Sequence, residues 1–322
     1  MSIETFLTSN GWGAAQQQPL AGDASSRRYI RLYIGSKQAI LMIDPDGDTS
    51  LFATLSEHLT RLGLSAPAIY ARTDDLMLLE DFGDAQFARV VETEPDMEFR
   101  LYQAATDVLC HLETQAVPEV LRVATQDVLA NMVEPAFTHY LPMLQVEPND
   151  AVSDIITCLS DLLHQYLPTE SVLVLRDFHA ENMIWLPERE GVRRVGLLDF
   201  QDAVAGPPVY DLVSLLQDAR RDVSDTCQLS TLQHFLNTTG RQESTVMPIF
   251  HLLGVQRNLR ILGIFARLAK ERGKPGYLSL IPRVWQHIEK SLSHPAAKQL
   301  EPLVRRVFPT PTAERLRALI PS

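Results

Sequence analysis

The sequence has few of the features that mark secreted or membrane proteins. Its three cysteines, Cys110, Cys158 and Cys227, are widely spaced and odd in number, which gives neither a disulfide framework nor a metal-binding CxxC pair. No run of about 18 consecutive apolar residues occurs, and the first residues lack a basic stretch followed by an apolar one. We therefore expect a cytoplasmic protein with free thiols.

The chain also lacks an excess of positive charge. It has 29 Lys and Arg against 40 Asp and Glu, a net charge of −11, so non-specific attraction to nucleic acid or to an anionic membrane surface is not expected. Apolar residues, in contrast, make up 45% of its 322 residues. That is enough for a sizeable core, in two domains or in one domain with two lobes. The oligomeric state is left open by the sequence.

The first 80 or so residues alternate between helical and extended patterns. Leucines recur every three to four residues in the stretch that ends at Gly63, as in an amphipathic helix. Apolar and β-branched runs around short polar turns predict two hairpins. The expected elements are a short helix at 2–10, strands at 27–34 and 38–44, a helix at 49–63, and strands at 67–72 and 76–83.

From Gly83 onward the chain is mainly helical in pattern. Periodic segments lie near 96–115, 125–144, 150–167, 211–220 and 244–272, and the proline-rich tail has room for one short helix. One hairpin, with strands at 183–186 and 195–200, interrupts them. The sequence thus predicts an α+β protein with a small β-rich lobe, residues 1–82, and a larger mainly helical lobe, residues 83–322.

The stretch "LRDFHAENMIWL", Leu175 to Leu186, places polar residues directly before this hairpin. Pairing of Met183 with about residue 199 returns Asp199 to Asn182. Two carboxylates and an amide, counting Asp177, suit a hard cation such as Mg²⁺. Zinc is not indicated, because His179 has no second His or Cys at ligand spacing.

The pair of motifs "LRDFHAEN" and "LLDFQDA" resembles the aminoglycoside phosphotransferase family, which has the bilobal protein-kinase-like fold. In that family a loop H-x-D-x-x-x-x-N precedes a hairpin and a metal-binding Asp. The resemblance implies ATP-dependent phosphoryl transfer, in which Asp177 orients the acceptor hydroxyl and accepts its proton while Asn182 and Asp199 hold Mg²⁺. Arg176 and His179 would support the loop.

The resemblance extends to both expected lobes. "GDASSRRYIRL" stands where the family has its nucleotide-covering hairpin, and "LLEDFGD" resembles the hinge that reads the adenine edge. The implied counterparts are Ser25 in the covering turn, Glu57 as the structural Glu of the first-lobe helix, Glu80, Asp81 and Phe82 in the hinge, and Asp211 of "GPPVYDL" as a brace for the catalytic loop.

Two family features are missing. Leu175 stands where the family usually has His, and the strand "QAILMIDP" lacks the phosphate-binding lysine. Lys37, the single lysine among the first 80 residues, falls in a turn. Arg28 and Arg31 on the neighbouring strand are the candidates to supply that charge. No GxGxxG occurs either, so small residues and backbone N–H groups must cover the phosphates.

Within the family, "GDASSRRY", "GPPVYDLVSLLQD" and "VQRNLRILGIFARLAKERGKPGYL" resemble the anomeric sugar kinases that phosphorylate N-acetylmuramate and N-acetylglucosamine at C1. Gln201, Arg257 and Asn258 are the candidate acceptor-binding residues. The carboxylate of N-acetylmuramate favours an arginine near Asp177.

Two alternatives remain open. The first is a kinase of the same fold for an aminoglycoside, choline or homoserine, whose cationic acceptors favour carboxylates or aromatics in the pocket. The second is a non-catalytic binding protein on the same scaffold, which the missing lysine motivates. In each case the partner is a small molecule, either a sugar or an amino alcohol.

Overall fold

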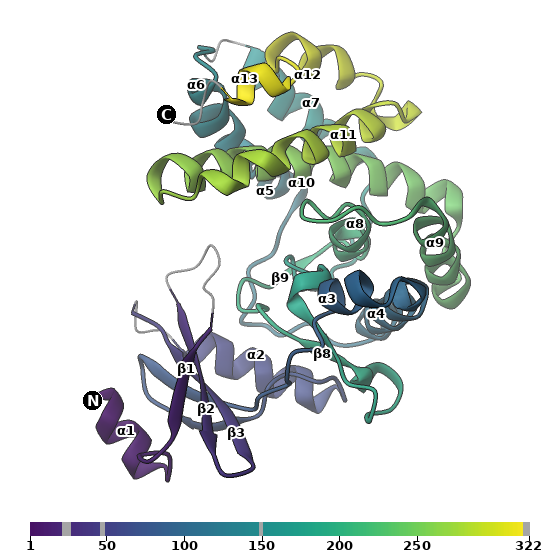
Figure 1. Cartoon of the computed structure of the whole chain (residues 1–322). Helices are drawn as coiled ribbons and strands as arrows, with labels where there is room; N and C mark the ends of the chain where they lie inside the picture. Colours follow the sequence, from purple (N-terminus) through teal and green to yellow (C-terminus); the bar gives the residue numbers. More distant parts are fainter. Residues whose placement is uncertain (21–26, 46–48, 148–150, 318–322) are drawn as a thin grey trace. The chain divides into compact units, whose positions relative to one another are not determined.

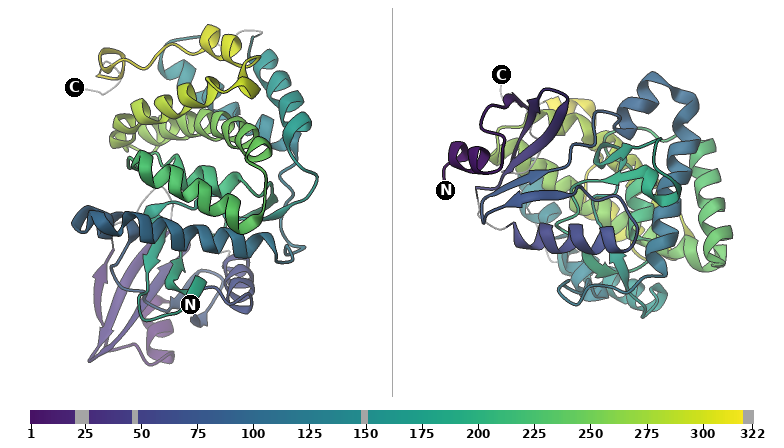
Figure 2. Two further views of the ribbon diagram at one scale, coloured as in Figure 1. Left: turned by 90° about the vertical axis from the view of Figure 1, so that its right-hand side faces the viewer. Right: turned by 90° about the horizontal axis from the view of Figure 1, so that it is seen from below.

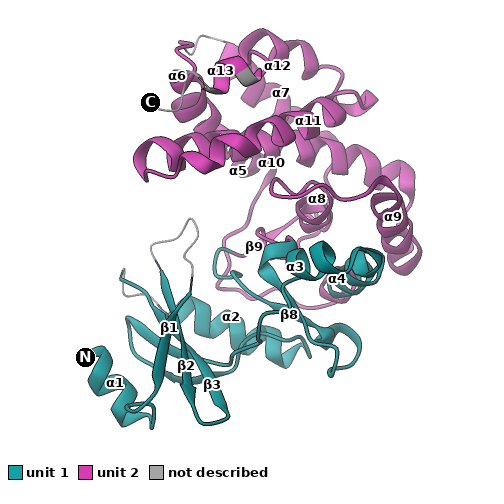
Figure 3. Ribbon diagram, in the orientation of Figure 1, with its two compact units in different colours: residues 1–108, 180–202 teal, residues 109–179, 203–322 magenta. Residues whose placement is uncertain are grey.

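The computed structural model describes residues 1–20, 27–45, 49–147 and 151–317. They form two compact units (Figure 3): unit 1 comprises residues 1–108 and 180–202, and unit 2 comprises residues 109–179 and 203–322. The boundary therefore does not fall after Phe82, where the sequence pattern changes from strands to helices. Unit 1 continues because Phe87 of helix α3 (Phe87–Thr93) packs edge-on against Trp185, with ring centroids 6.2 Å apart.

Unit 1 is built on a five-stranded antiparallel sheet of order β1-β2-β3-β5-β4. Four of its strands and helices α1 and α2 were expected from the sequence. Strand β1 was missed because all four of its residues are exposed, which leaves no apolar alternation. The elements are α1 (Ile3–Ser9), β1 (Gln16–Pro19), β2 (Arg28–Ile34), β3 (Lys37–Ile43), α2 (Ser50–Arg61), β4 (Ile69–Arg72) and β5 (Leu76–Leu79).

Helices cover the sheet on both faces, which explains why all four residues of β5 are buried. On one face, Phe6 and Leu7 of α1 pack with alternate residues of the strands, such as Leu41 and Leu78. Helix α2 lies on the other side of the sheet in Figure 1. Its Phe52 stacks on Phe200, with ring centroids 4.8 Å apart, so the segment beside Asp199 is anchored to this layer.

The expected hairpin is present in unit 1 as β7 (Met183–Trp185) and β8 (Val195–Leu197). Met183 pairs with Leu197 and not with residue 199. The predicted register was wrong by two residues because the connection contains a 3₁₀ turn, Gly191–Arg194, which moves the start of the second strand. Asp199 thus lies two residues beyond the last strand pair.

Unit 2 is mainly helical and is organised around the 29-residue helix α10 (Glu243–Glu271). Helix α11 (Ile281–Leu292) lies alongside it in Figures 1 and 2, and α7 (Ala151–Tyr166) and α8 (Tyr210–Leu216) also contact it. Its other helices are α5 (Gln126–Asn131), α6 (Leu141–Met143), α9 (Asp225–Thr239), α12 (Glu301–Val307) and α13 (Ala313–Arg317), and α4 (Glu98–Glu113) runs into it from unit 1.

Close backbone approach fixes α10 within this unit. A Cβ atom at Gly263 would lie 2.0 Å from the carbonyl carbon of Pro135, next to a short π-helical segment, Ala136–Tyr140. Glycine is therefore required where the two segments touch.

None of the described helices is long and apolar enough to cross a membrane.

Short or polar elements of unit 2 were missed by the sequence patterns. Strands β6 (Val172–Val174) and β9 (Val204–Gly206) have three residues each, too few to show a period. Helix α9 is half polar and buries few residues. The helices predicted near 96–115, 150–167 and 244–272 are confirmed as α4, α7 and α10.

Candidate active site

The loop that carries Asp177 is held by its backbone. The carboxylate of Asp211, on α8, accepts hydrogen bonds from the N–H of Leu175 at 2.6 Å and from the N–H of Arg176 at 2.8 Å. The Ser214 hydroxyl, one turn further on α8, donates to the carbonyl of Arg176 at 2.7 Å. Asp211 therefore braces the loop, and the absent histidine at Leu175 is not needed for this support.

Asp211 is 2% exposed. Burial raises the pKa of Asp211 to about 7, although the two backbone N–H groups and the charge of Arg257 act in the opposite direction. Asp177 itself is only half-buried, so its carboxylate can meet a ligand while the carboxylate behind the loop cannot.

His179 is buried and closes the same loop. Its Nε2 lies 3.4 Å from Nη1 of Arg220. Burial, reinforced by the charges of Arg220 and Arg257, holds the pKa of His179 well below its usual range. A neutral imidazole next to an arginine fits the loop-supporting position expected from the sequence better than a metal ligand or a general base.

Two residues of the motif adopt left-handed backbone conformations. Arg176 has φ 69° and Asp199 has φ 57°. Of the described residues outside glycine, only Gln145 shares this feature. Such conformations cost about 1–2 kcal/mol per residue, and they are found more often at functional sites than elsewhere.

Asn182 and Asp199 lie side by side in unit 1. The Nδ2 of Asn182 is 3.4 Å from Oδ2 of Asp199, and the N–H of Leu198 donates to the carbonyl of Asn182 at 3.0 Å. The Nε2 of Gln201 donates to Oδ1 of Asp199 at 2.6 Å. Gln201, expected at the acceptor, therefore orients the carboxylate of Asp199.

The donor set of Asn182 and Asp199 fits Mg²⁺. One carboxylate and one amide oxygen match a cation that takes few protein ligands and keeps water and phosphate oxygens in its shell. Among the described residues there is no group of three or more His, Cys, Asp or Glu placed to hold a metal.

The hinge residues combine structural side chains with open backbone groups. The Glu80 carboxylate pairs with Arg189 at 2.5 Å, and the guanidinium of Arg189 lies over the ring of Phe82 at 5.0 Å. Phe82 also fits against Gly196, where a Cβ atom would lie 2.8 Å from its ring. Within the described ranges, no hydrogen bond occupies the backbone N–H of Asp81 or Phe82.

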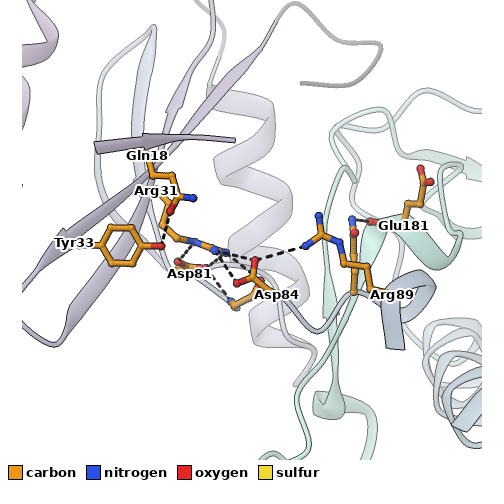
Figure 4. A network of polar contacts seen from close by, with 9 residues as sticks. Gln18, Arg31, Tyr33, Asp81, Asp84, Arg89 and Glu181 are labelled. Carbon is orange, nitrogen blue, oxygen red and sulfur yellow. Dashed lines mark hydrogen bonds and ion pairs between the residues drawn. The ribbon is translucent and has the colours of Figure 1, made fainter. Parts of the chain in front are cut away.

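Arg31 is a buried cation at the centre of a charge network that joins buried Asp81 to exposed Asp84 (Figure 4). Its guanidinium lies 2.6 Å from Asp81 and donates to Asp84 at 2.8 Å and to the carbonyl of Gly83 at 3.2 Å. Two carboxylates therefore already balance the charge of Arg31. It ties strand β2 to the hinge, and the expectation that it supplies the missing phosphate charge is not supported.

Arg27, one residue before β2, offers a better-placed cation. Its Nε donates to Oδ2 of Asp44 at 2.8 Å, and the two side chains are 14% and 4% exposed. The charge of Asp199 acts on Arg27 and on Tyr29. Burial and Asp199 together raise the pKa of Tyr29 to about 12. Arg27 was missed because the sequence shows three nearby arginines, at 27, 28 and 31, but not the direction in which each side chain points.

The remaining nucleotide-binding candidates are Arg28, Ser25 and Glu57. Arg28 is exposed, and Ser25 lies outside the described residues. Glu57 lies on the exposed side of α2 and lines a cavity of about 850 Å³ together with Glu80 and Arg189. Glu57 forms no ion pair in the described part of the chain, as the missing lysine leads one to expect; the carboxylate that pairs with Arg27 is that of Asp44.

The acceptor-binding candidates on α10 differ from one another. Asn258 is fully buried and donates to Oε1 of Gln217 at 2.6 Å and to the carbonyl of Gly254 at 2.8 Å, so it belongs to the core and we withdraw it as an acceptor ligand. Arg257 is 6% exposed and lies near Asp211 and His179. Arg260, one turn later, is half-buried and was not among the sequence candidates.

The α+β fold and the loop that carries Asp177 are the features of a phosphotransferase of the kinase-like class. The sequence pattern of the phosphotransferase enzyme family matches residues 16–244. The chain belongs to this family, and it is a small-molecule kinase.

Two relatives are similar over almost their whole length. One is the N-acetylmuramate/N-acetylglucosamine kinase of Caulobacter vibrioides, 34% identical, covering 95% of this chain and 96% of the relative. The other is the kinase of the same name from Pseudomonas aeruginosa, 29% identical, covering 90% and 89%.

Solved structures share the fold at low identity. The Plasmodium vivax ethanolamine kinase has a TM-score of 0.64 and 13% identity, and the match covers 89% of this chain and 84% of that one. The ADP-bound aminoglycoside phosphotransferase APH(2'')-Ib has a TM-score of 0.62 and 14% identity, covering 90% and 99%. The expected α+β kinase-like fold is confirmed.

Proposed function

We propose that the protein transfers the γ-phosphoryl group of ATP to the anomeric hydroxyl of N-acetylmuramate or N-acetylglucosamine. The observation that carries this proposal is the Asp177 loop, which Asp211 and Ser214 fix by its backbone. It occurs in a chain that is 34% identical, over 95% of its length, to a kinase named for these two sugars.

Asp177 is the group that orients the acceptor hydroxyl and accepts its proton. A carboxylate suits this task because phosphoryl transfer depends on positioning and charge neutralisation more than on covalent help. Its half-buried position leaves it open to an acceptor, and the bonds to Asp211 keep the loop backbone from shifting when a sugar binds.

Asn182 and Asp199 are the proposed Mg²⁺ ligands. The bound ion would neutralise charge on the nucleotide phosphates. Gln201 keeps Asp199 in one orientation through its 2.6 Å hydrogen bond, so the carboxylate is preorganised before the ion arrives.

Nucleotide recognition is assigned to the hinge and to Arg27. The open N–H groups of Asp81 and Phe82 are available to an adenine edge. Arg27, supported by Asp44 and within the field of Asp199, is the candidate for the phosphate contact that the missing lysine makes elsewhere in the family. An ATP-dependent reaction would place the protein in the cytoplasm, where ATP is supplied.

The proposal is tested by following ATP consumption with N-acetylmuramate, N-acetylglucosamine, an aminoglycoside, choline and homoserine, and reading the phosphorylated position by phosphorus NMR. We expect an anomeric phosphate from the two amino sugars, dependent on Mg²⁺. Turnover of choline, homoserine or the aminoglycoside alone would replace the proposed acceptor, and phosphate at a position other than C1 would refute the anomeric assignment.

A further inference from the structure

Two arginines on one face of α10 lack the partners that buried charges normally have. Arg257 is 6% exposed, and its Nη1 is buried without a hydrogen-bond partner among the described residues. Arg260, three residues further on, is half-buried and forms neither a hydrogen bond nor an ion pair within the ranges that the structure describes. Because burying a charge without a partner is costly, such a pair is expected where a ligand brings the opposite charge.

The surroundings of these arginines belong to the loop that carries Asp177. Helix α10 packs against α8, which begins at Tyr210 and whose Asp211 holds the backbone of the loop. Burial lowers the pKa of Arg260, and the charges of Tyr210 and Asp177 act in the opposite direction. Arg260 therefore lies within electrostatic reach of the proposed base, in the same compact unit.

Arg257 and Arg260 differ in what they can do. Arg257 is close enough to the buried acids Asp211 and Asp218 to act on both, so its charge is balanced at a distance by the interior of unit 2. The acid that acts on Arg260 is instead Asp177, which is only half-buried. Of the two, Arg260 is the one that can turn its guanidinium to a ligand.

We propose that Arg260 recognises the carboxylate of the acceptor sugar, with Arg257 adding positive charge behind it. This rests on the proposed function, because an acceptor positioned by Asp177 is the ligand that Arg260 would meet. N-acetylmuramate carries a lactyl carboxylate that N-acetylglucosamine lacks. The planar guanidinium can bind that group through two parallel hydrogen bonds, so Arg260 is a specificity-determining residue for the acidic sugar.

The test compares Arg260→Gln with the wild-type protein on both sugars, measuring kcat and KM for each. We expect kcat/KM for N-acetylmuramate to fall about 100-fold, the loss typical of a hydrogen bond to a charged group, mainly through KM. The fall for N-acetylglucosamine should be at least about ten times smaller. Arg260→Lys keeps the charge without the fork and should lose about ten-fold on N-acetylmuramate.

Arg267→Gln is the matched control, since Arg267 is exposed two turns further along the same helix; both sugars should stay within about two-fold of wild type. An equal loss on both sugars in Arg260→Gln would assign Arg260 to the transferred phosphoryl group and overturn the inference alone. Unchanged kinetics on N-acetylmuramate would overturn it too. Wild-type protein that phosphorylates neither sugar would refute the proposed function and this inference together.

Discussion

The arginines of the sheet in unit 1 and those of helix α10 in unit 2 show opposite arrangements. Arg27 and Arg31 each face buried carboxylates at hydrogen-bond distance. Arg257 and Arg260 have no hydrogen bond or ion pair in the described part of the chain. Arg31 thus joins segments of unit 1, whereas Arg257 and Arg260 keep donors that a ligand could use.

The largest effect is expected for the carboxylate of Asp177, the proposed base that Arg260 lies near. Asp177→Asn should lower kcat about 10³-fold, because the amide cannot accept the proton of the acceptor hydroxyl. The free energy of unfolding should change little, since Asp177 is not fully buried. Asp161→Asn, at an exposed position of α7, is the control. Near-normal turnover in Asp177→Asn would refute the proposed mechanism.

Arg27 differs from Arg31, because it pairs with Asp44 and is also the proposed contact of the nucleotide phosphates. Arg27→Met should raise KM for ATP about 100-fold through loss of a charge-assisted contact, and Arg27→Lys should recover most of that loss. Exposed Arg28 provides the control, with Arg28→Met close to wild type. If Arg27→Met weakens stability but leaves KM for ATP unchanged, Arg27 is purely structural and the phosphate cation lies elsewhere.

The free energy of unfolding should distinguish the paired Arg31 from Arg260, which is unpaired within the described residues. Arg31→Met leaves Asp81 buried without its cation and should cost about 3 kcal/mol, as urea unfolding would report. Arg260→Met removes no pair from the described structure and should change the free energy of unfolding by less than about 0.5 kcal/mol, or raise it. Similar losses for the two variants would show that Arg260 is also a structural charge.

A further prediction concerns a neutral group in the interior of unit 2. Burial, with the charges of His294 and Lys290, lowers the pKa of His251 to about 4. Between pH about 6.5 and about 4 the unfolded chain binds a proton at His251 that the folded protein does not, so this contribution to stability is lost as pH falls through that range. His251→Gln has no such proton, and its stability relative to wild type should rise by at most about 1.4 kcal/mol per pH unit on acidification. A constant difference across that range would show that His251 is not held neutral.

Sequence reasoning worked where a period or a motif existed. The apolar runs of β3 and β5 and the leucine spacing of α2 predicted most of unit 1, and the motif around Asp177 identified the loop. The sequence could not show in which direction a side chain points. Arg27, Arg28 and Arg31 are alike in the sequence, but one faces Asp44, one faces solvent and one faces the hinge.

Long-range packing set the remaining limits. The 3₁₀ turn at 191–194 shifts the hairpin register by two residues from the one expected. The sequence around the turn shows no pattern from which this shift could be predicted. The exposure of Asn258 and Arg260 on one helix depends on what packs against each turn of α10. Asn258 is fully buried and Arg260, two residues later, is half-buried, a difference that the sequence of α10 alone does not show.

The left-handed backbone at Arg176 and Asp199 implies that selection for stability and selection for activity would favour different residues at these positions. In a library selected only for resistance to heat or protease, glycine should become enriched at position 176, where the strain would be relieved by about 1 kcal/mol. At position 199 the same pressure would favour glycine or asparagine. A library selected for growth that depends on the kinase should instead retain aspartate at 199, so comparing the two populations would separate positions kept for folding from positions kept for chemistry.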